Sequence, residues 1–500
     1  MSTVSGSLGR IGRSRRSSVA QCNSYRGVAL LSQLHERLLG RETFSLAAGL
    51  EVSQWQSREA IQALQMEKLR RLVAHATRCC PYYRALHLPP PEELARPGDL
   101  AKLPLLTRNM LREHAEEMRW SEMPGRMITD RTHGTRDEPF AFYCDRRRQA
   151  WDKANRLRGH RWQGFELGDR ELHLWPVDPP RRLIGRVKQQ LRHLRDRLLC
   201  ERQLDILTID DRGFDEAWGE WRAFDPDRVT AYPSSLARFL AGGGAALESV
   251  GSSSLRAVFL TGEVTFAWQE RAVREQLGAA TAQCYGLQEA GAIAFECEQG
   301  GWHVCDESVM VEIVREGRPA RAGELGEVVV TALESRAMPV IRYCTGDVVR
   351  AGAAECACGR GLSVMPRVLG RTGDFLLAAD GEMIEPARVV ASLAGVLEDG
   401  AYQVRQDETG SVELSTLERF GDRGRGPFEA ARRLAKLIGA ENDVSVRRVA
   451  DLERSRFGKC RYVQSARTEL CLALPRDESN KQSCQRNRQP PTPRNIPPRP

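Results

Sequence analysis

The stretch from Met338 to Asp374 decides the fold of this chain, and it reads MPVIRYCTGDVVRAGAAECACGRGLSVMPRVLGRTGD. Three short signals follow one another in it: RYxTGD, which ends at Asp347; CxCGR, which carries Cys356 and Cys358; and GRxxD, which carries Arg371. The character of the chain changes directly after the third signal. Each signal is weak alone, so their fixed order is the feature that the rest of the chain has to match.

The size and composition of the chain bound its class. Five hundred residues are too many for one ordinary core, so we expect two or more domains. No apolar run reaches the length of a membrane span. A hydrophobic content of 41% and a mean hydropathy of −0.45 are typical of a soluble globular protein.

The fourteen cysteines are scattered and include the adjacent pair Cys79-Cys80. They lack the spacing of a small disulfide framework, and no apolar signal-peptide core precedes them. We therefore expect a reducing cytoplasm, in which a few of the cysteines bind metal.

The net charge of +8 lies mostly in the two ends of the chain. Residues 1–26 carry five arginines and no acid, and residues 476–500 carry six basic and two acidic side chains, which leaves the body at about −1. We therefore expect no nucleic-acid partner. Residues 1–26 are predicted to be a disordered basic extension, with a transit peptide as the alternative, and residues 466–500 a disordered tail rich in proline, arginine, asparagine and glutamine.

The first periodic segment, residues 58–78, has apolar side chains at helical spacing. The sequence Pro81-Tyr82-Tyr83-Arg84 ends that predicted helix, LPLLT follows at residues 103–107, and a second helix is expected from Arg108. Plain helical packing explains these residues without a catalytic role.

Residues 182–202 are predicted to form a basic amphipathic helix. Its apolar stripe comprises Leu183, Val187, Leu191, Leu194 and Leu198, and its polar face comprises Arg186, Lys188, Arg192, Arg195 and Arg197. We expect a surface helix packed by its leucines. Contact with a membrane surface or an acidic partner is the alternative.

From residue 203 apolar strands alternate with helical stretches such as 269–277, which predicts a parallel or mixed sheet. Ligands bind beyond the carboxyl ends of the strands in such sheets. Two strands end at Tyr232-Pro233-Ser234 and at Thr261-Gly262-Glu263. We therefore expect Tyr232, Ser234, Gly262 and Glu263 to line the substrate site.

Two pairs of residues suggest a metal site. Cys297 and His303 are six residues apart, and Cys356 and Cys358 are two apart. Three thiolates and an imidazole make a closed tetrahedral zinc set, whose role is structural because no position stays open for water. Cys305 is a substitute ligand in this interpretation. Between the pairs, residues 309–314 and 326–331 are predicted to form a β-hairpin.

The order of these motifs resembles the phenylacetate–CoA ligase branch of the adenylate-forming enzymes. The resemblance covers roughly residues 55–465 and includes PYYR, LPLLT, the aromatic-Gly-x-x-Glu motif at Tyr285-Gly286-Leu287-Gln288-Glu289, RYxTGD, GRxxD and Gly458-Lys459. The spacing after Glu289 is similar to that of the capsular polysaccharide biosynthesis and coenzyme F390 synthetase-like relatives, whose loop is shorter.

The resemblance implies a mixed α/β (α+β) fold in two parts. A large N-terminal adenylation domain of mixed sheets and helices, with a zinc knuckle, would span residues 27–370. A small, mobile C-terminal α+β domain would span residues 371–465 and carry the catalytic Lys459. The boundary at Arg371 would act as a hinge, where Gly373 stands in place of the Asp that is usual in the family.

The resemblance also implies an AMP-forming acid ligase that turns a carboxylic acid and ATP into an acyl-adenylate and then transfers the acyl group. Coenzyme A is the default acceptor, and an amine or a carrier protein is the alternative. Lys459 and Glu289 would be catalytic, the latter through Mg²⁺. The remaining implied contacts are Tyr285 and Gly286 with adenine, Asp347 with the ribose, Arg371 with the nucleotide at the hinge, and Ala290 with the acid.

The phosphate loop expected within residues 128–145 departs from the family. Thr132, Gly134 and Thr135 keep the small side chains that allow backbone N–H groups to approach phosphate. His133, Arg136 and Asp137 replace the usual Ser, Thr and Gly, and Asp137 would repel phosphate. The alternative function is therefore a catalytically weak or silent relative that binds a nucleotide or a partner.

Overall fold

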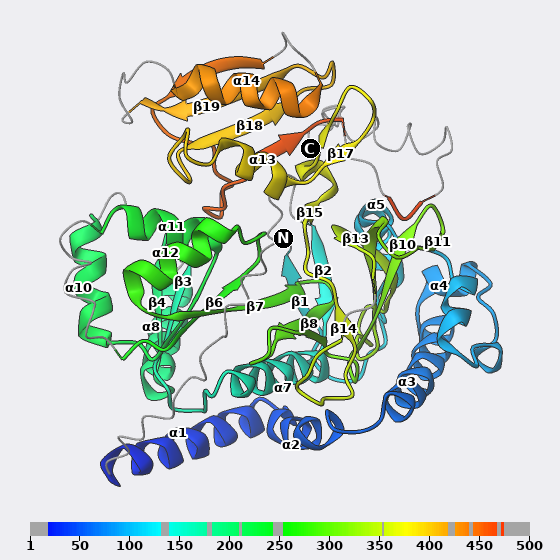
Figure 1. The fold of residues 1–500 in the computed structure, drawn as a ribbon. Coiled ribbons are helices and arrows are strands. Elements are labelled where there is room, and N and C mark those ends of the chain that lie inside the picture. The colour runs from blue at the N-terminus through cyan, green and yellow to red at the C-terminus, as the bar shows by residue number, and fades with distance from the viewer. Residues whose placement is uncertain are drawn as a thin grey trace, which may run out of the picture.

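The computed structural model of the chain describes residues 19–131, 140–177, 183–209, 213–243, 254–352, 355–418, 426–439, 444–467 and 472–474. Figure 1 shows a large lower part that holds most of the strands and helices, and a smaller upper part that holds the strands and helices near the end of the chain. A mixed α/β fold is thereby confirmed. No helix within these ranges is long and apolar enough to cross a membrane.

In Figure 1 the base of the large part is formed by the first members, up to Ser53, of a run of helical elements. The elements of this run are α1 (Val19–Leu38), α2 (Thr43–Ser53), α3 (Arg58–Cys79), α4 (Pro81–Ala85), the 3₁₀ turns η1 (Pro91–Glu93) and η2 (Pro97–Lys102), α5 (Arg108–Glu113) and α6 (Ala115–Met118). The predicted helices over 58–78 and from Arg108 are confirmed. Each has an N-cap hydroxyl, because Ser57 accepts from the Ala60 amide at 3.2 Å and Thr107 accepts from the Met110 amide at 3.3 Å.

Helix α1 begins at Val19, inside the segment expected to be disordered. The Tyr25 hydroxyl donates to Asp169 at 3.0 Å, and Val28 and Ser32 are buried. The basic composition of residues 1–26 therefore concealed the start of a packed helix.

The central sheet of the large part has eight strands. They are β3 (Glu171–Trp175), β4 (Glu201–Asp205), β5 (Arg228–Ala231), β6 (Ala257–Thr261), β7 (Ala280–Leu287), β8 (Gly291–Glu296), β9 (Trp302–Val304) and β14 (Val364–Met365). The spatial order is β14-β9-β8-β7-β6-β5-β3-β4, and the pairs from β4 to β7 are parallel, as predicted, while the others are antiparallel.

Helices cover the two faces of this sheet differently. The helices here are α7 (Arg146–Trp162), α8 (Leu183–Leu198), α10 (Phe214–Phe224), α11 (Pro233–Ala241) and α12 (Ala267–Leu277). Apolar side chains of α10, α11 and α12 share one core with Leu172, Val229 and Val258 on one face. Helix α7 lies toward β8 on the other side.

A five-stranded antiparallel sheet lies beside the central one in Figure 1. Its order is β11 (Arg318–Pro319), β10 (Val309–Arg315), β12 (Leu325–Ala332), β13 (Val340–Arg350) and β15 (Gly370–Arg371). Strands β10 and β12 pair in antiparallel register from Val309↔Ala332, which confirms the predicted hairpin. A two-stranded sheet, β1 (Ile128–Arg131) with β2 (Ala141–Cys144), completes this side.

The smaller part holds the elements after β15. They are η4 (Thr372–Asp374), β16 (Leu376–Leu377), β17 (Met383–Ile384), α13 (Pro386–Leu393), β18 (Tyr402–Gln406), β19 (Val412–Leu417), α14 (Gly426–Ile438), β20 (Val444–Val449) and β21 (Val463–Ser465). The main sheet has the order β20-β19-β18-β21, and apolar side chains of α13 and α14 pack with it in one core. The domain boundaries predicted at residues 370 and 465 are compatible with this grouping and stay predictions.

Residues 472–474 correct the prediction that the chain is disordered after residue 466. The Glu316 and Gly317 amides donate to the carbonyl oxygens of Leu472 and Ala473 at 2.8 and 2.7 Å. Ala473 is fully buried beside Val314 and Cys344. The apolar run Leu470–Leu474 was masked by the polar composition around it.

The leucines of α8 also differ from expectation. The helix forms over Leu183–Leu198, but Leu191, Leu194 and Leu198 are exposed rather than packed. The side chains of residues 183–188 lie outside the described ones. Helical periodicity fixed the helix and did not determine which face would be buried.

Candidate active site

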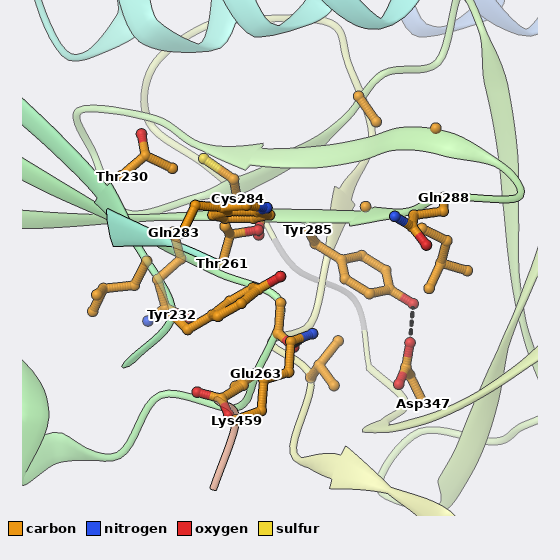
Figure 2. A pocket seen from close by; sticks show the side chains of 18 of the residues that line it. Thr230, Tyr232, Thr261, Glu263, Gln283, Cys284, Tyr285, Gln288, Asp347 and Lys459 are labelled. Atoms are coloured by element: carbon orange, nitrogen blue, oxygen red, sulfur yellow. Dashed lines mark hydrogen bonds between the residues drawn. The ribbon is translucent and has the colours of Figure 1, made fainter. Parts of the chain in front are cut away.

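A cavity of about 770 Å³ lies where the smaller part meets the large one. Its wall contains the carboxyl ends of strands β5, β6 and β7, part of β13, one side of α7 and residues 459–463 of the smaller part. Figure 2 shows Lys459, Tyr232, Glu263, Tyr285 and Asp347 around it. The topology thus brings residues more than two hundred positions apart to one site at the edge where α/β sheets bind ligands.

Lys459 enters the cavity from the smaller part. Its Nζ donates to the carbonyl oxygen of Gly262 at 2.9 Å and lies 4.4 Å from the centre of the Tyr232 ring. Burial lowers the pKa of Lys459, while the nearby Glu263 carboxylate opposes that shift. The ammonium therefore lies in a largely dry site, where the Gly262 carbonyl, the Tyr232 ring and the Glu263 carboxylate stabilise it.

Gly262 is required for this approach. Its φ is +76°, and a Cβ built there would lie 2.7 Å from the Tyr232 ring and 3.2 Å from Lys459 Nζ. Any other residue would be strained in this backbone conformation and would push the lysine away.

Glu263 fastens the two parts together. Its carboxylate accepts from the Ser234 amide and hydroxyl, both at 2.9 Å, and from the Cys460 amide at 3.1 Å. The Ser234 hydroxyl oxygen also accepts from the Cys460 amide at 3.0 Å. Burial raises the pKa of Glu263, and Lys459 opposes that shift. Glu263 and Ser234 thus position the residue that follows Lys459.

Asp347 and Tyr285 face each other across the other end of the cavity (Figure 2). The Tyr285 hydroxyl donates to Asp347 Oδ2 at 2.7 Å, and Arg371 Nε lies 3.4 Å from Oδ1. Strand pairing sets this arrangement, because Asp347 of β13 is directly opposite Arg371 of β15. Burial raises the pKa of Asp347, and Arg371 opposes that shift.

Glu289 lies at the turn between β7 and β8 and is buried. Its Oε1 is 3.3 Å from Arg108 Nη1 and 3.4 Å from the Tyr343 hydroxyl. Arg108 is the first residue of α5, directly after the LPLLT segment. No role in the site was expected for that segment, and the only sequence signal of Arg108 was an arginine directly after a helix cap.

The expected metal ligands come together away from the cavity. Cys297, His303, Cys356 and Cys358 each place one ligand atom within 4.8 Å of the other three. Cys297 Sγ is 3.5 Å from Cys356 Sγ, and His303 Nε2 is 3.1 Å from Cys358 Sγ. Cys305 is buried and lies outside this group.

The other predicted residues divide into three sets. Gly286 and Arg371 line the cavity, as do Tyr232, Gly262 and Glu263. Ala290 packs in the core of the large part, and neither Ala290 nor Ser234 lines the cavity. Thr132, Gly134 and Thr135 lie outside the described residues, so the expected phosphate loop has no described geometry.

The comparisons with known proteins agree with this geometry. No protein-family model matches the chain. The phenylacetate–coenzyme A ligase of Thermus thermophilus is 28% identical over 390 residues, which are 72% of this chain and 81% of the relative. The phenylacetate–coenzyme A ligase of Escherichia coli is 25% identical over 264 residues, which are 48% of this chain and 58% of the relative.

Solved structures share the fold at lower identity. A 2-hydroxyisobutyryl-CoA ligase in its postadenylation state matches with a TM-score of 0.66 and 17% identity, over 87% of this chain and 94% of that one. The same ligase in its thioesterification state matches over the same shares with 18% identity and a TM-score of 0.52.

The particular closeness to capsular polysaccharide and coenzyme F390 synthetase-like relatives stays a prediction. The chain is therefore similar in sequence to phenylacetate–coenzyme A ligases and shares its fold with a 2-hydroxyisobutyryl-CoA ligase.

Proposed function

We propose that the protein joins a carboxylic acid to ATP, releasing pyrophosphate and forming an acyl-adenylate, and then transfers the acyl group to coenzyme A. The relatives in Thermus thermophilus and Escherichia coli are coenzyme A ligases of this kind by name. The observation that carries the proposal is the entry of Lys459 into a cavity whose opposite wall holds Tyr285 and Asp347.

In the first half-reaction a carboxylate oxygen attacks the α-phosphorus of ATP, and pyrophosphate leaves. Negative charge then builds between the carboxylate and the α-phosphate. In the proposal Lys459 is the cation nearest to the carboxylate and the α-phosphate. It would exchange its hydrogen bond with the Gly262 carbonyl for hydrogen bonds with the carboxylate and phosphate oxygens. A preorganised cation in a dry site stabilises such charge more than it does in water.

The nucleoside of ATP fits the wall around Tyr285. Its ring would stack on adenine, and Gly286 beside it leaves room for the base. The Asp347 carboxylate accepts one hydrogen bond from Tyr285 and retains lone pairs for the ribose hydroxyls. Arg371 faces the same carboxylate from β15 and would keep it charged.

Glu289 is the candidate ligand for Mg²⁺. A carboxylate suits this hard cation, which binds between protein oxygen and nucleotide phosphate. In the present geometry Arg108 and Tyr343 hold one oxygen of Glu289. The cation would supply charge neutralisation to the phosphates, and Arg108 would be the side chain that gives way or pairs with phosphate instead.

A structural zinc ion fits the cluster of Cys297, His303, Cys356 and Cys358. The Sγ atoms of Cys297 and Cys356, 3.5 Å apart, are spaced as two ligands of one tetrahedral ion with Zn–S bonds of about 2.3 Å. His303 Nδ1 lies 3.4 Å from the Leu362 carbonyl oxygen, which would fix the ring for binding through Nε2. The ion would hold the segment between β13 and β14 to β9.

The transfer step would follow a rotation of the smaller part about residues 371–374. Gly373 supplies backbone freedom at this joint. The rotation would withdraw Lys459 and open the cavity to the acceptor. Coenzyme A is the acceptor that the relatives favour, and an amine or a carrier protein is the alternative.

The cysteines favour a location that keeps thiols reduced. Within the described ranges they are free thiols. We infer the cytoplasm as the place of action, since disulfides are rare there and zinc thiolates persist.

The test is ATP–pyrophosphate exchange with a panel of aryl and fatty acids, followed by thioester formation with coenzyme A. Exchange that depends on an added acid, together with a thioester product, is the expected result. Exchange without a thioester would move the proposal to an amine or carrier acceptor. Nucleotide binding without exchange across the panel would instead identify a catalytically silent relative.

A further inference from the structure

The far end of the cavity has a polar wall between α7 and strands β3, β4 and β5. Along β3 and β5, Leu172 and Val229 point into the apolar core under α10–α12. The residues at alternate positions point the other way, toward α7, because side chains alternate along a strand. The polar members of this wall are Arg156, His160, His173, Glu201, Gln203 and Thr230.

Most charge in this wall is already matched. Glu171 accepts from Arg228 Nη2 and Thr230 Oγ1, both at 2.8 Å, and it pairs with Arg156. Burial alone would raise the pKa of Glu171, but Arg156 and Arg228 hold it well below its ordinary value. Glu171 is therefore a fixed anion that holds the wall together and has little left to offer a ligand.

Glu201 is different. It begins β4 directly beside Glu171 in the strand register and lines the cavity. Among the described residues, no hydrogen bond or ion pair joins its carboxylate. Burial and the neighbouring Glu171 raise the pKa of Glu201, with Arg156 opposing. Glu201 is only partly buried, so water in the cavity can donate to its carboxylate, and a ligand that displaces this water has to supply a hydrogen-bond donor in its place.

Arg156 supplies the complementary group. It reaches Glu171 with one nitrogen, and its side chain is still 44% exposed on the side of the cavity. A hydrogen-bond donor and a hydrogen-bond acceptor therefore lie close together at this end. A hydroxyl group can accept from the first and donate to the second at once.

The strand register places these groups beyond the reacting end. Lys459 lies over Tyr232, and Figure 2 shows Thr230 on the far side of Tyr232 from the lysine. Thr230 is opposite His173 on β3, and Arg228, two residues further, is opposite Glu171. Four residues of strand correspond to about 13 Å, which is the length of an extended acyl tail rather than of a short acid.

We propose that this end of the cavity selects a carboxylic acid whose extended tail carries a hydroxyl group that donates to Glu201 and accepts from Arg156. An unsubstituted aryl or alkyl tail would displace water from both groups and return no hydrogen bond to either. The inference deepens the proposed function and rests on it, because it names the class of acid that the same site adenylates.

The test compares matched acids in ATP–pyrophosphate exchange. The pairs are phenylacetate with 4-hydroxyphenylacetate, octanoate with 8-hydroxyoctanoate, and decanoate with 10-hydroxydecanoate, and 8-aminooctanoate is an additional arm. We expect kcat/KM to be at least tenfold higher for the hydroxylated member of one of the two longer pairs. Equal or better exchange with the plain acids would overturn the inference and leave the proposed function standing. Preference for the amine over the hydroxyl would also overturn it.

Variants of Glu201 test whether this residue causes the preference for the hydroxylated acid. Glu201→Leu should reduce the hydroxyl preference to less than threefold and raise kcat/KM for the plain acid, whereas Glu201→Gln should keep part of the preference. Glu275→Leu, an exposed position on α12, is the matched control and should behave as the parent. A preference that survives Glu201→Leu would contradict the assignment. Absence of exchange with every acid would count against the proposed function itself, and the inference would fail with it.

Discussion

Lys459 Nζ and the carbonyl oxygen of Gly262 lie 2.9 Å apart, although the first belongs to the smaller part of the molecule and the second to the central sheet. Cys460, the next residue, is tied to Ser234 and Glu263 by its amide. The contact therefore places one cation where the proposed first half-reaction needs it.

Lys459→Ala should lower pyrophosphate release by about 10²–10³-fold, by analogy with the loss of one donor to a developing anion. It should leave ATP affinity nearly unchanged, since Tyr285 and Asp347 are on the opposite wall. Transfer from a supplied acyl-adenylate should be spared, because the lysine has then left the cavity. Separate assays of adenylation and of acyl transfer measure these effects. Unchanged pyrophosphate release would contradict the role proposed for Lys459.

Tyr285→Phe removes the hydroxyl that donates to Asp347 at 2.7 Å and keeps the ring. A hydrogen bond to a charged group is worth about 1.5–3 kcal/mol, so the KM for ATP should rise about tenfold or more. The kcat should change little, because the acid and Lys459 are not touched. A KM for ATP equal to that of the parent would show that the hydroxyl does not shape the nucleotide site.

Much of the architecture was accessible from the sequence because it depends on local periodicity and on the order of motifs. The helix of residues 58–78, the parallel strands ending at Ala231 and Thr261, and the hairpin of β10 and β12 all formed where the pattern predicted. Motif residues that are far apart in the sequence lie together in the structure, such as Tyr285 and Asp347.

The remaining features depend on long-range packing that periodicity does not encode. In the sequence, β3 looks like an ordinary buried strand. Only the structure shows that Glu171 of β3 faces Arg156 of α7 and forms a polar wall with it. Glu263, which lines the cavity, also holds the Cys460 amide, and no sequence pattern indicated that contact. The expectations that the leucines of α8 are packed and that the chain around Ala473 is disordered were wrong, because only tertiary contact decides burial.

Zinc should be present at about one ion per chain in purified protein, and Cys356→Ser should reduce that content. Because metal binding contributes to folding free energy, the same change should lower Tm by on the order of 5–10 °C. Cys79→Ser is the control, since Cys79 is far along the chain from the cluster and not part of it. Elemental analysis and thermal melts give both readings, and full folding stability without metal would contradict a structural role.

Truncation separates the packed part of the C-terminal segment from the rest. A chain ending at Leu474 should match the parent in stability. A chain ending at Arg467 loses the buried Ala473 and the two backbone hydrogen bonds to Glu316 and Gly317, so it should be less stable by about 1–3 kcal/mol. Urea unfolding of the two truncated chains measures the difference. Equal midpoints would mean that residues 472–474 contribute nothing to stability.

We expect His173 to make the protein less stable in mild acid. Burial lowers its pKa from 6.5 to about 4 in the folded protein. The charged and titratable groups that face it are Glu171, Arg156, Arg228, Asp196 and His160. Since the folded state resists protonation, the unfolded state binds the extra proton first. The contribution of His173 is therefore complete above pH 6.5 and is lost as the pH falls toward 4.

A shift of this size corresponds to about 3 kcal/mol, which should appear as a decline in unfolding free energy between pH 6.5 and 4. His173→Gln should flatten part of that decline, and His160 should retain its own share, because burial also lowers its pKa. His193→Gln, at an exposed position on α8, is the control and should follow the parent. Urea unfolding at half-unit steps of pH measures the three profiles. If His173→Gln and the parent lose stability in parallel over this range, His173 is not a group that the folded state holds neutral.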